Sequence, residues 1–96
     1  MSRGRERMVS HLEGNGRLLA DGKTPLSVRY FLDTWSETIA AGTRISTEMQ
    51  RSDGFVWWSS GALPDPFGVL ETEDGQQLRV NLFEFKANRA HFCRVR

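Results

Sequence analysis

The chain has almost no cysteine and no long apolar run, and both shortages limit where it can work. Cys93 is the single cysteine, so no internal disulfide can form and the fold needs no oxidising compartment. The longest uninterrupted apolar stretch is Phe55-Val56-Trp57-Trp58, which is far too short to span a membrane. Residues 1–7 contain three arginines and lead into no apolar segment of the kind that a secretory signal requires. We therefore expect a cytoplasmic protein with no membrane association.

The sequence is also poor in the groups that catalysis needs. Its two histidines are His11 and His91, and it has neither a glycine-rich phosphate loop nor a hydrolase nucleophile motif. His91 and Cys93 would point to the same side of a strand, but two ligands do not complete a metal site. The acidic cluster within residues 71–74 stands at an Asp-Gly turn, where solvated carboxylates are common. The sequence therefore predicts a protein that is not an enzyme and has no cofactor or metal site.

Net charge is small, at +1, but it is unevenly distributed. Residues 1–7 have a net charge of +2, residues 86–96 of +4, and residues 8–85 of −5. Nucleic-acid-binding domains usually have a strongly basic balance, so the total disfavours that class while the basic ends keep it open. Because domain termini are often close together, we expect the arginines of residues 1–7 to approach the basic group of residues 86–96. The two groups would then form one positive edge.

Turn and strand signals alternate along the chain. The clearest strands are Leu26–Leu32 and Leu78–Leu82, where apolar and polar residues alternate with a period of two. Four dipeptides of the hairpin type divide the chain: Asn15-Gly16, Asp21-Gly22, Asp53-Gly54 and Asp74-Gly75. Shorter candidate strands are 17–20, 44–49, 55–59, 68–72 and 90–95. The pattern predicts an all-β or mainly β fold, a small antiparallel meander that closes into a barrel or a sandwich. We expect a basic N-terminal tail over residues 1–7 and a single β domain over residues 8–96.

For two segments the sequence does not decide between helix and strand. Residues 35–42 fit either a short helix that ends at Gly42 or the second part of a hairpin. The alternating pattern of residues 45–49 would supply a partner strand and favours the hairpin. Residues 5–13 fit a strand and a helical face equally well.

Two irregularities are also expected. Phe83 and Phe85 change the phase of the Leu78–Leu82 pattern, which predicts a bulge or a strand that crosses between sheets. Residues 59–66 contain two prolines and predict a loop. A weak repeat relates the segment from Gly16 to Tyr30 to the segment from Gly68 to Leu82, since each has a glycine, a short strand, an Asp-Gly turn and a longer alternating strand. Either two related hairpins or an ordinary meander of short strands would give this pattern.

Aromatic and basic residues are the candidates for binding. Along a strand, Phe55 and Trp57 share one face while Val56 and Trp58 share the other, and a small domain cannot easily cover both faces. Tryptophan is a favoured anchor at protein interfaces, and aromatic rings also stack on nucleic-acid bases. We therefore predict a protein-interaction or self-association module centred on Trp58, with a nucleic-acid-binding small barrel as the alternative. The candidate binding residues of the two hypotheses are Trp58, Phe31, Lys86, Arg89, Arg94 and Arg96.

Overall fold

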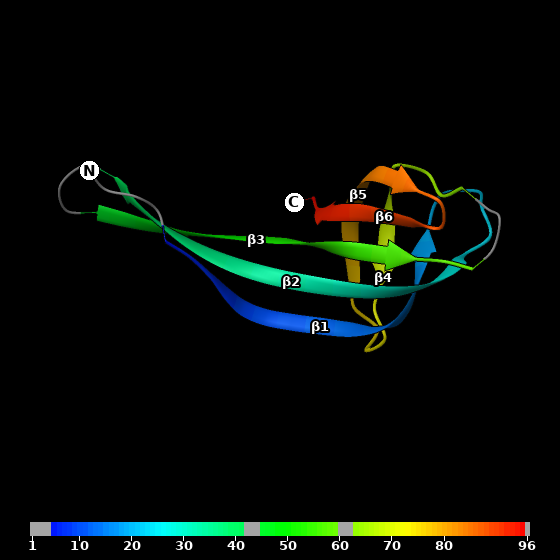
Figure 1. The fold of residues 1–96 in the computed structure, drawn as a ribbon, viewed down its shortest axis with the longest axis horizontal. Coiled ribbons are helices and arrows are strands. Elements are labelled where there is room, and N and C mark those ends of the chain that lie inside the picture. Colours follow the sequence, from blue (N-terminus) through cyan, green and yellow to red (C-terminus); the bar gives the residue numbers. More distant parts are fainter. Residues whose placement is uncertain (1–4, 42–44, 60–62, 96) are drawn as a thin grey trace.

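Six β-strands and their connections make up the computed structural model, which describes residues 5–41, 45–59 and 63–95 (Figure 1). The strands are β1 (Arg5–Leu19), β2 (Leu26–Ala41), β3 (Ile45–Trp57), β4 (Phe67–Glu71), β5 (Gln77–Lys86) and β6 (Arg89–Arg94). No helix occurs in these ranges, so the predicted all-β class is confirmed. The same ranges accordingly contain no helix that could cross a membrane.

The strands form one antiparallel sheet whose two ends meet. Strands β1, β2 and β3 are one meander and strands β4, β5 and β6 are another. The meanders join where β1 pairs with β4 and where β3 pairs with β6, which gives the closed order β1-β2-β3-β6-β5-β4. The predicted meander that closes on itself is therefore confirmed as a ring of strands.

Alternate residues of each strand point into the ring and make its core. The inward set begins with Leu18 on β1, continues with Val28, Tyr30 and Leu32 on β2, and includes the fully buried Phe92 on β6. Among the residues whose burial the structure describes, the buried apolar set is Leu18, Val28, Tyr30, Leu32, Val56, Trp58, Leu70, Leu78, Val80, Leu82, Ala90 and Phe92. Burial of these side chains is the main stabilising term of the fold, because each removes a large apolar area from water.

Strands β1, β2 and β3 are longer than the ring and extend beyond it as an arm (Figure 1). Pairing with the second meander is limited to Arg17–Leu19 on β1 and Asp53–Trp57 on β3. We define the arm as residues 5–10, 34–41 and 45–52, which pair among themselves on the far side of those contacts. The arm accounts for the elongated shape of the molecule, which measures 52 × 26 × 21 Å.

Two of the four predicted hairpin turns are wrong, and the reason is steric. Gly16 lies inside β1 and Gly54 inside β3. A Cβ atom on Gly54 would stand 1.9 Å from the carbonyl oxygen of Phe31, and one on Gly16 would stand 2.2 Å from that of Glu71. These glycines permit close approach of neighbouring strands instead of reversing the chain. The other two dipeptides do form turns, with positive φ at Gly22 (70°) and Gly75 (89°).

The segments left open by the sequence are strands. Residues 5–13 belong to β1, and residues 35–41 belong to β2 and pair with β3, which confirms the hairpin and excludes the helix there. The phase change in β5 is a bulge between Phe83 and Lys86, where Glu84 has a φ of 52°. Phe85 is thereby turned to pack against the core. Ser59 and residues 63–66 lie outside the strands, as predicted for a loop.

The strand order is unchanged when the two meanders are exchanged, which agrees with the weak repeat. The repeat equates Leu18 with Leu70, and these two residues lie directly opposite each other in the β1–β4 pairing. Gly22 and Gly75, the turn glycines of the two units, both have positive φ. Equivalent positions of the two hairpins are therefore paired at Leu18 and Leu70, as two related hairpins would require.

The predicted meeting of the basic termini is not observed. β1 begins at Arg5, so residues 5–7 lie in a strand and not in a tail, and residues 1–4 lie outside the described ranges. Arg5 pairs with Thr38 near the tip of the arm. In the described pairing β1 neighbours β2 and β4, whereas β6 neighbours β3 and β5. The arm carries the start of β1 away from the ring, so β1 and β6 share no strand edge in the described pairing (Figure 1).

Candidate functional site

A row of aromatic side chains crosses four neighbouring strands on the outer face of the ring. Phe31 of β2 lies directly opposite Phe55 of β3, Phe55 lies opposite His91 of β6, and His91 lies opposite Phe83 of β5. We call Phe31, Phe55, His91 and Phe83 the aromatic row. Each is one residue out of phase with the buried positions of its strand, so the alternation that fills the core also places these rings outside.

The rings of the aromatic row touch one another from strand to strand. The ring centroids are 5.1 Å apart between Phe31 and Phe55, 3.9 Å between Phe55 and His91, and 5.5 Å between His91 and Phe83. Trp57 lies beside the row, with its ring stacked at 5.8 Å from Phe55. Aromatic pairs at such separations stabilise the sheet beyond the area they bury.

The row is partly open to solvent. Phe31, Phe55, Trp57 and His91 are half-buried, and Phe83 is 39% exposed. No segment of the described chain packs over this outer face, because the strands pair edge to edge and bury their opposite face. The row therefore presents ring edges and faces that a flat ligand could contact.

A second row, rich in cations, runs parallel to the first. Arg29 of β2 lies opposite Trp57 of β3, Trp57 lies opposite Arg89 of β6, and Arg89 pairs with Lys86 of β5. We call Arg29, Trp57, Arg89 and Lys86 the basic row. On β2, β3 and β6 it is two residues from the aromatic row along the strand, which corresponds to about 7 Å. All three of its cationic residues are exposed.

Acidic residues lie on the other side of the aromatic row. Asp33 of β2 and Asp53 of β3 are directly opposite each other, two residues beyond Phe31 and Phe55. His11 of β1 bonds through Nδ1 to Asp33, and its Nε2 lies 3.3 Å from Glu13 Oε2. The hydrogen bond to Asp33, and then that to Glu13, raises the pKa of His11 above its usual value. Asp33 and Asp53 thus lie on the side of the aromatic row opposite to the cations, while Glu84 lies against the row itself, with its Oε2 3.3 Å from His91 Nε2.

The structure separates the residues that the sequence grouped as binding candidates. Phe31 belongs to the aromatic row, and Lys86 and Arg89 belong to the basic row. Arg94 pairs with the buried Val80, which places it on the inward-facing side at the end of β6. Arg96 lies outside the described residues.

The prediction of an exposed Trp58 is wrong. Trp58 is 5% exposed and packs edge-on against Phe85, with ring centroids 6.4 Å apart. Its backbone nitrogen donates a hydrogen bond of 2.9 Å to the carbonyl oxygen of Asn88 in the β5–β6 turn. Trp58 therefore belongs to the core at one end of the ring, and Trp57 is the tryptophan that faces outward.

The acidic cluster of residues 71–74 is held by local bonds. Glu71 accepts hydrogen bonds from Arg17, with an Nη2–Oε1 distance of 2.5 Å, and Arg17 lowers the pKa of Glu71. Asp74 accepts a bond from the hydroxyl of Thr72, and this bond lowers the pKa of Asp74. These contacts order a strand pair and a tight turn, as expected for turn chemistry. In the described part of the chain, no group of three or more His, Cys, Asp or Glu side chains is arranged to hold a metal ion.

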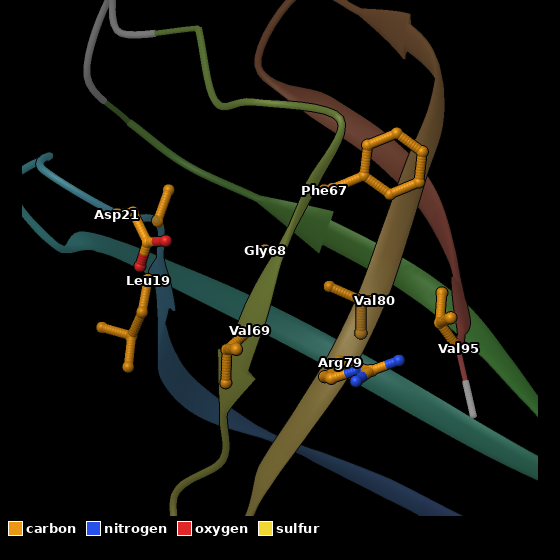
Figure 2. A pocket seen from close by; sticks show the side chains of 9 residues that line it. Leu19, Asp21, Phe67, Gly68, Val69, Arg79, Val80 and Val95 are labelled. Atoms are coloured by element: carbon orange, nitrogen blue, oxygen red, sulfur yellow. The ribbon is translucent and has the colours of Figure 1, made fainter.

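An apolar groove of about 310 Å³ lies elsewhere on the ring (Figure 2). Its walls come from β1, β4, β5 and the end of the chain, and Phe67 at its rim is 69% exposed. The lining residues are Leu19, Ala20, Asp21, Phe67, Gly68, Val69, Arg79, Val80 and Val95. The groove has one acidic and one basic side chain among apolar ones, and it lacks the ordered rows of the other face.

Sequence reasoning found Phe31 but missed the aromatic row as a unit. The alternation correctly placed Phe55 and Trp57 on one face and Phe83 out of phase with the core. What joins Phe55 to His91 and Phe83 is the register of β3 with β6, and the register between strands so distant in sequence cannot be read from one chain.

Comparisons with protein-family models, curated proteins and solved structures find no match for this chain. Its function is therefore inferred from the two rows themselves.

Proposed function

We propose that this protein is a cytoplasmic binding module for single-stranded nucleic acid, and not an enzyme. The observation that supports the proposal is the pair of parallel rows on the outer face, one aromatic and one cationic, across β2, β3, β6 and β5. Proteins that bind single strands combine aromatic rings that stack on bases with cations that follow the phosphate backbone.

The aromatic row offers several stacking positions for unpaired bases. Neighbouring strands are about 4.8 Å apart, so its four rings extend over roughly 14 Å across the sheet. Each base stacked on an aromatic side chain contributes about 1–3 kcal/mol, with little preference between bases. The row thus suits a ligand that brings several flat rings in succession.

The basic row would hold the backbone of that ligand. Its distance of about 7 Å from the aromatic row allows bases on one row and phosphates on the other. Three cations, from Arg29, Lys86 and Arg89, would neutralise about three phosphates. For single strands this predicts a slope of about −2 for log K against log salt concentration.

The small net charge is compatible with this site because two of the acidic residues lie away from the cations. Asp33 and Asp53 lie on the side of the aromatic row opposite to the cations. A phosphate backbone would therefore be attracted to one side and repelled from the other, which fixes the side on which it runs.

Self-association is a second candidate, favoured by the arm. In the described pairing, β3 has a partner on one side only from Ile45 to Ser52, and such open strand edges can pair with another chain. The protein-interaction hypothesis in its original form depended on an exposed Trp58, whose burial removes that anchor.

Fluorescence anisotropy with labelled 12-nucleotide DNA and RNA oligomers at low salt tests the nucleic-acid proposal. We expect micromolar binding that weakens at least tenfold in Phe55→Ala and in the double variant Arg29→Gln/Arg89→Gln, because each removes part of one row. Phe67→Ala is the matched control, since Phe67 is a more exposed aromatic residue outside both rows. No binding at 100 μM protein, or equal losses in the control, would reject the proposal.

A further inference from the structure

A polar pocket opens where the core of the ring gives way to the arm. On the inward-facing side, the last apolar level contains Leu32, Gly54 and Phe92, which lie opposite one another. The next level contains Thr34 and Ser52, also directly opposite each other, and Arg94 follows Phe92 on β6. The pocket has a volume of about 420 Å³ and is lined by Thr34, Gln50, Arg51, Ser52 and Arg94. We call it the mouth pocket.

The described lining of the mouth pocket is rich in hydrogen-bond donors. None of its five lining residues is acidic, and two of them are arginines. The hydroxyl oxygens of Thr34 and Ser52 are 3.1 Å apart and partly buried. Arg51 contributes to the lining from the other face of the strand, since it lies opposite Trp35 and its guanidinium is 5.9 Å from the centre of the Trp35 ring. Among the described residues, the Arg94 guanidinium and the two hydroxyl groups are therefore donors that line this recess, and no carboxylate is among its described walls.

Arg94 is the charged hydrogen-bond donor of the mouth pocket. It is exposed at the end of β6, and its side chain forms no hydrogen bond or ion pair with the described residues. A guanidinium has five donors in a planar fork that matches the oxygens of phosphate. Thr34 and Ser52 can each turn a hydroxyl donor toward the same anion.

We infer that the mouth pocket binds a phosphate group, with Arg94 as the charged donor and the Thr34 and Ser52 hydroxyls as neutral donors. The site is distinct from the proposed nucleic-acid surface, because residues of the two alternate along the same strands and face opposite sides of the sheet. The phosphate could belong to a small phosphomonoester or to the terminal phosphate of an oligonucleotide, since both present the same oxygens.

Titration of isotope-labelled protein with inorganic phosphate, followed by amide chemical shifts at constant ionic strength, tests the site. We expect saturable shifts centred on Thr34, Ser52 and Arg94. The variant Arg94→Gln should weaken the affinity about tenfold, the loss usual for a charged hydrogen bond. Arg89→Gln, which removes a cation from the outer face of the same strand, should leave the phosphate affinity unchanged.

Ser52→Ala serves as a second variant in case Arg94→Gln does not fold, and it should weaken phosphate binding severalfold. Shifts no larger than those produced by equal chloride, or phosphate affinity that is the same in both mouth-pocket variants as in the parent, would overturn the inference.

Two further titrations distinguish a small phosphomonoester from the terminal phosphate of an oligonucleotide. Methyl phosphate alone should shift the mouth pocket if a small phosphomonoester is the ligand. A 5′-phosphorylated oligomer that shifts the mouth pocket, where the unphosphorylated oligomer shifts only the two rows, would identify the terminal phosphate. The double variant Arg29→Gln/Arg89→Gln tests the two proposals separately. If it loses oligomer binding but keeps the chemical-shift changes caused by phosphate, the mouth pocket binds phosphate independently of the two rows.

Discussion

Gly54 shows how a single residue fixes the close packing of two strands. It lies in β3 opposite Leu32 of β2, and there is no room for a side chain between it and the neighbouring backbone. A Cβ atom at position 54 would clash with the carbonyl oxygen of Phe31. Because that oxygen belongs to the backbone, the clash could be removed only if one of the two strands moved. The glycine of Asp53-Gly54 is therefore required by the close packing of two strands and not by a turn.

We predict that Gly54→Ala costs about 3 kcal/mol or more in the free energy of unfolding, because overpacking against backbone cannot be relieved by a side-chain rotation. Gly22→Ala is the control. Nothing lies within 4 Å of the position of its Cβ, so the cost there is the left-handed φ of 70° alone, about 1–2 kcal/mol. Urea unfolding followed by tryptophan fluorescence measures both. Equal losses in the two variants would show that β3 can move away from β2 without penalty.

His11 makes one part of the stability depend on pH. Its bonds to Asp33 and Glu13 raise its pKa in the folded state above the ordinary value of 6.5. A raised pKa means that the folded state binds the proton more tightly than the unfolded state does. The stabilisation is therefore full below pH 6.5 and is lost as the pH rises through the higher folded value.

Titration of the His11 ring by NMR should give a midpoint above 6.5. His11→Gln should lower the urea midpoint relative to the parent at pH 5.5, and the difference should shrink toward pH 8. A ring midpoint at or below 6.5, or a difference that grows with pH, contradicts the assigned bonds.

At the scale of elements, local patterns predicted the strands, and long-range register determined the site. Leu26–Leu32 and Leu78–Leu82 alternate so regularly that their inward residues follow from the sequence. The bulge after Phe83 was visible as a change of phase because it reorients Phe85. Which of Trp57 and Trp58 faces the core was not visible, since both faces of that strand are apolar and only pairing with β6 and closure of the ring decide it.

The same limit explains why the basic residues were grouped wrongly. Lys86, Arg89 and Arg94 are neighbours in sequence, but Arg89 and Arg94 are separated by an odd number of positions on one strand and so face opposite sides. Arg29, which is far away in sequence, completes the basic row through its register with Trp57. Charge counted along a chain thus misleads where strands sort alternate residues onto two faces.

At the scale of the whole molecule, the ring and the arm differ in how they are stabilised. The ring surrounds the buried apolar cluster, and each of its strands pairs on both sides within it. The described side chains on the inward face of the arm are polar, beginning at Thr34 and Ser52 and continuing with Ser36 and Gln50. Little apolar area is removed from water there, so the arm should open in local fluctuations that leave the ring intact.

Hydrogen exchange measured by mass spectrometry should therefore show two classes of strand segment in dilute protein. Peptides from residues 5–10 and 45–52 should exchange at least a hundredfold faster than peptides from residues 78–82 and 90–92, because the latter open only with the core.

Repeating the measurement at high protein concentration tests whether the open edge of β3 pairs with another copy of the chain. Protection of residues 45–52 that rises with concentration would support strand pairing between copies, whereas protection independent of concentration would assign the arm to a monomer. Uniform slow exchange across both classes in dilute protein would contradict the division into ring and arm, because the arm would then open only together with the core.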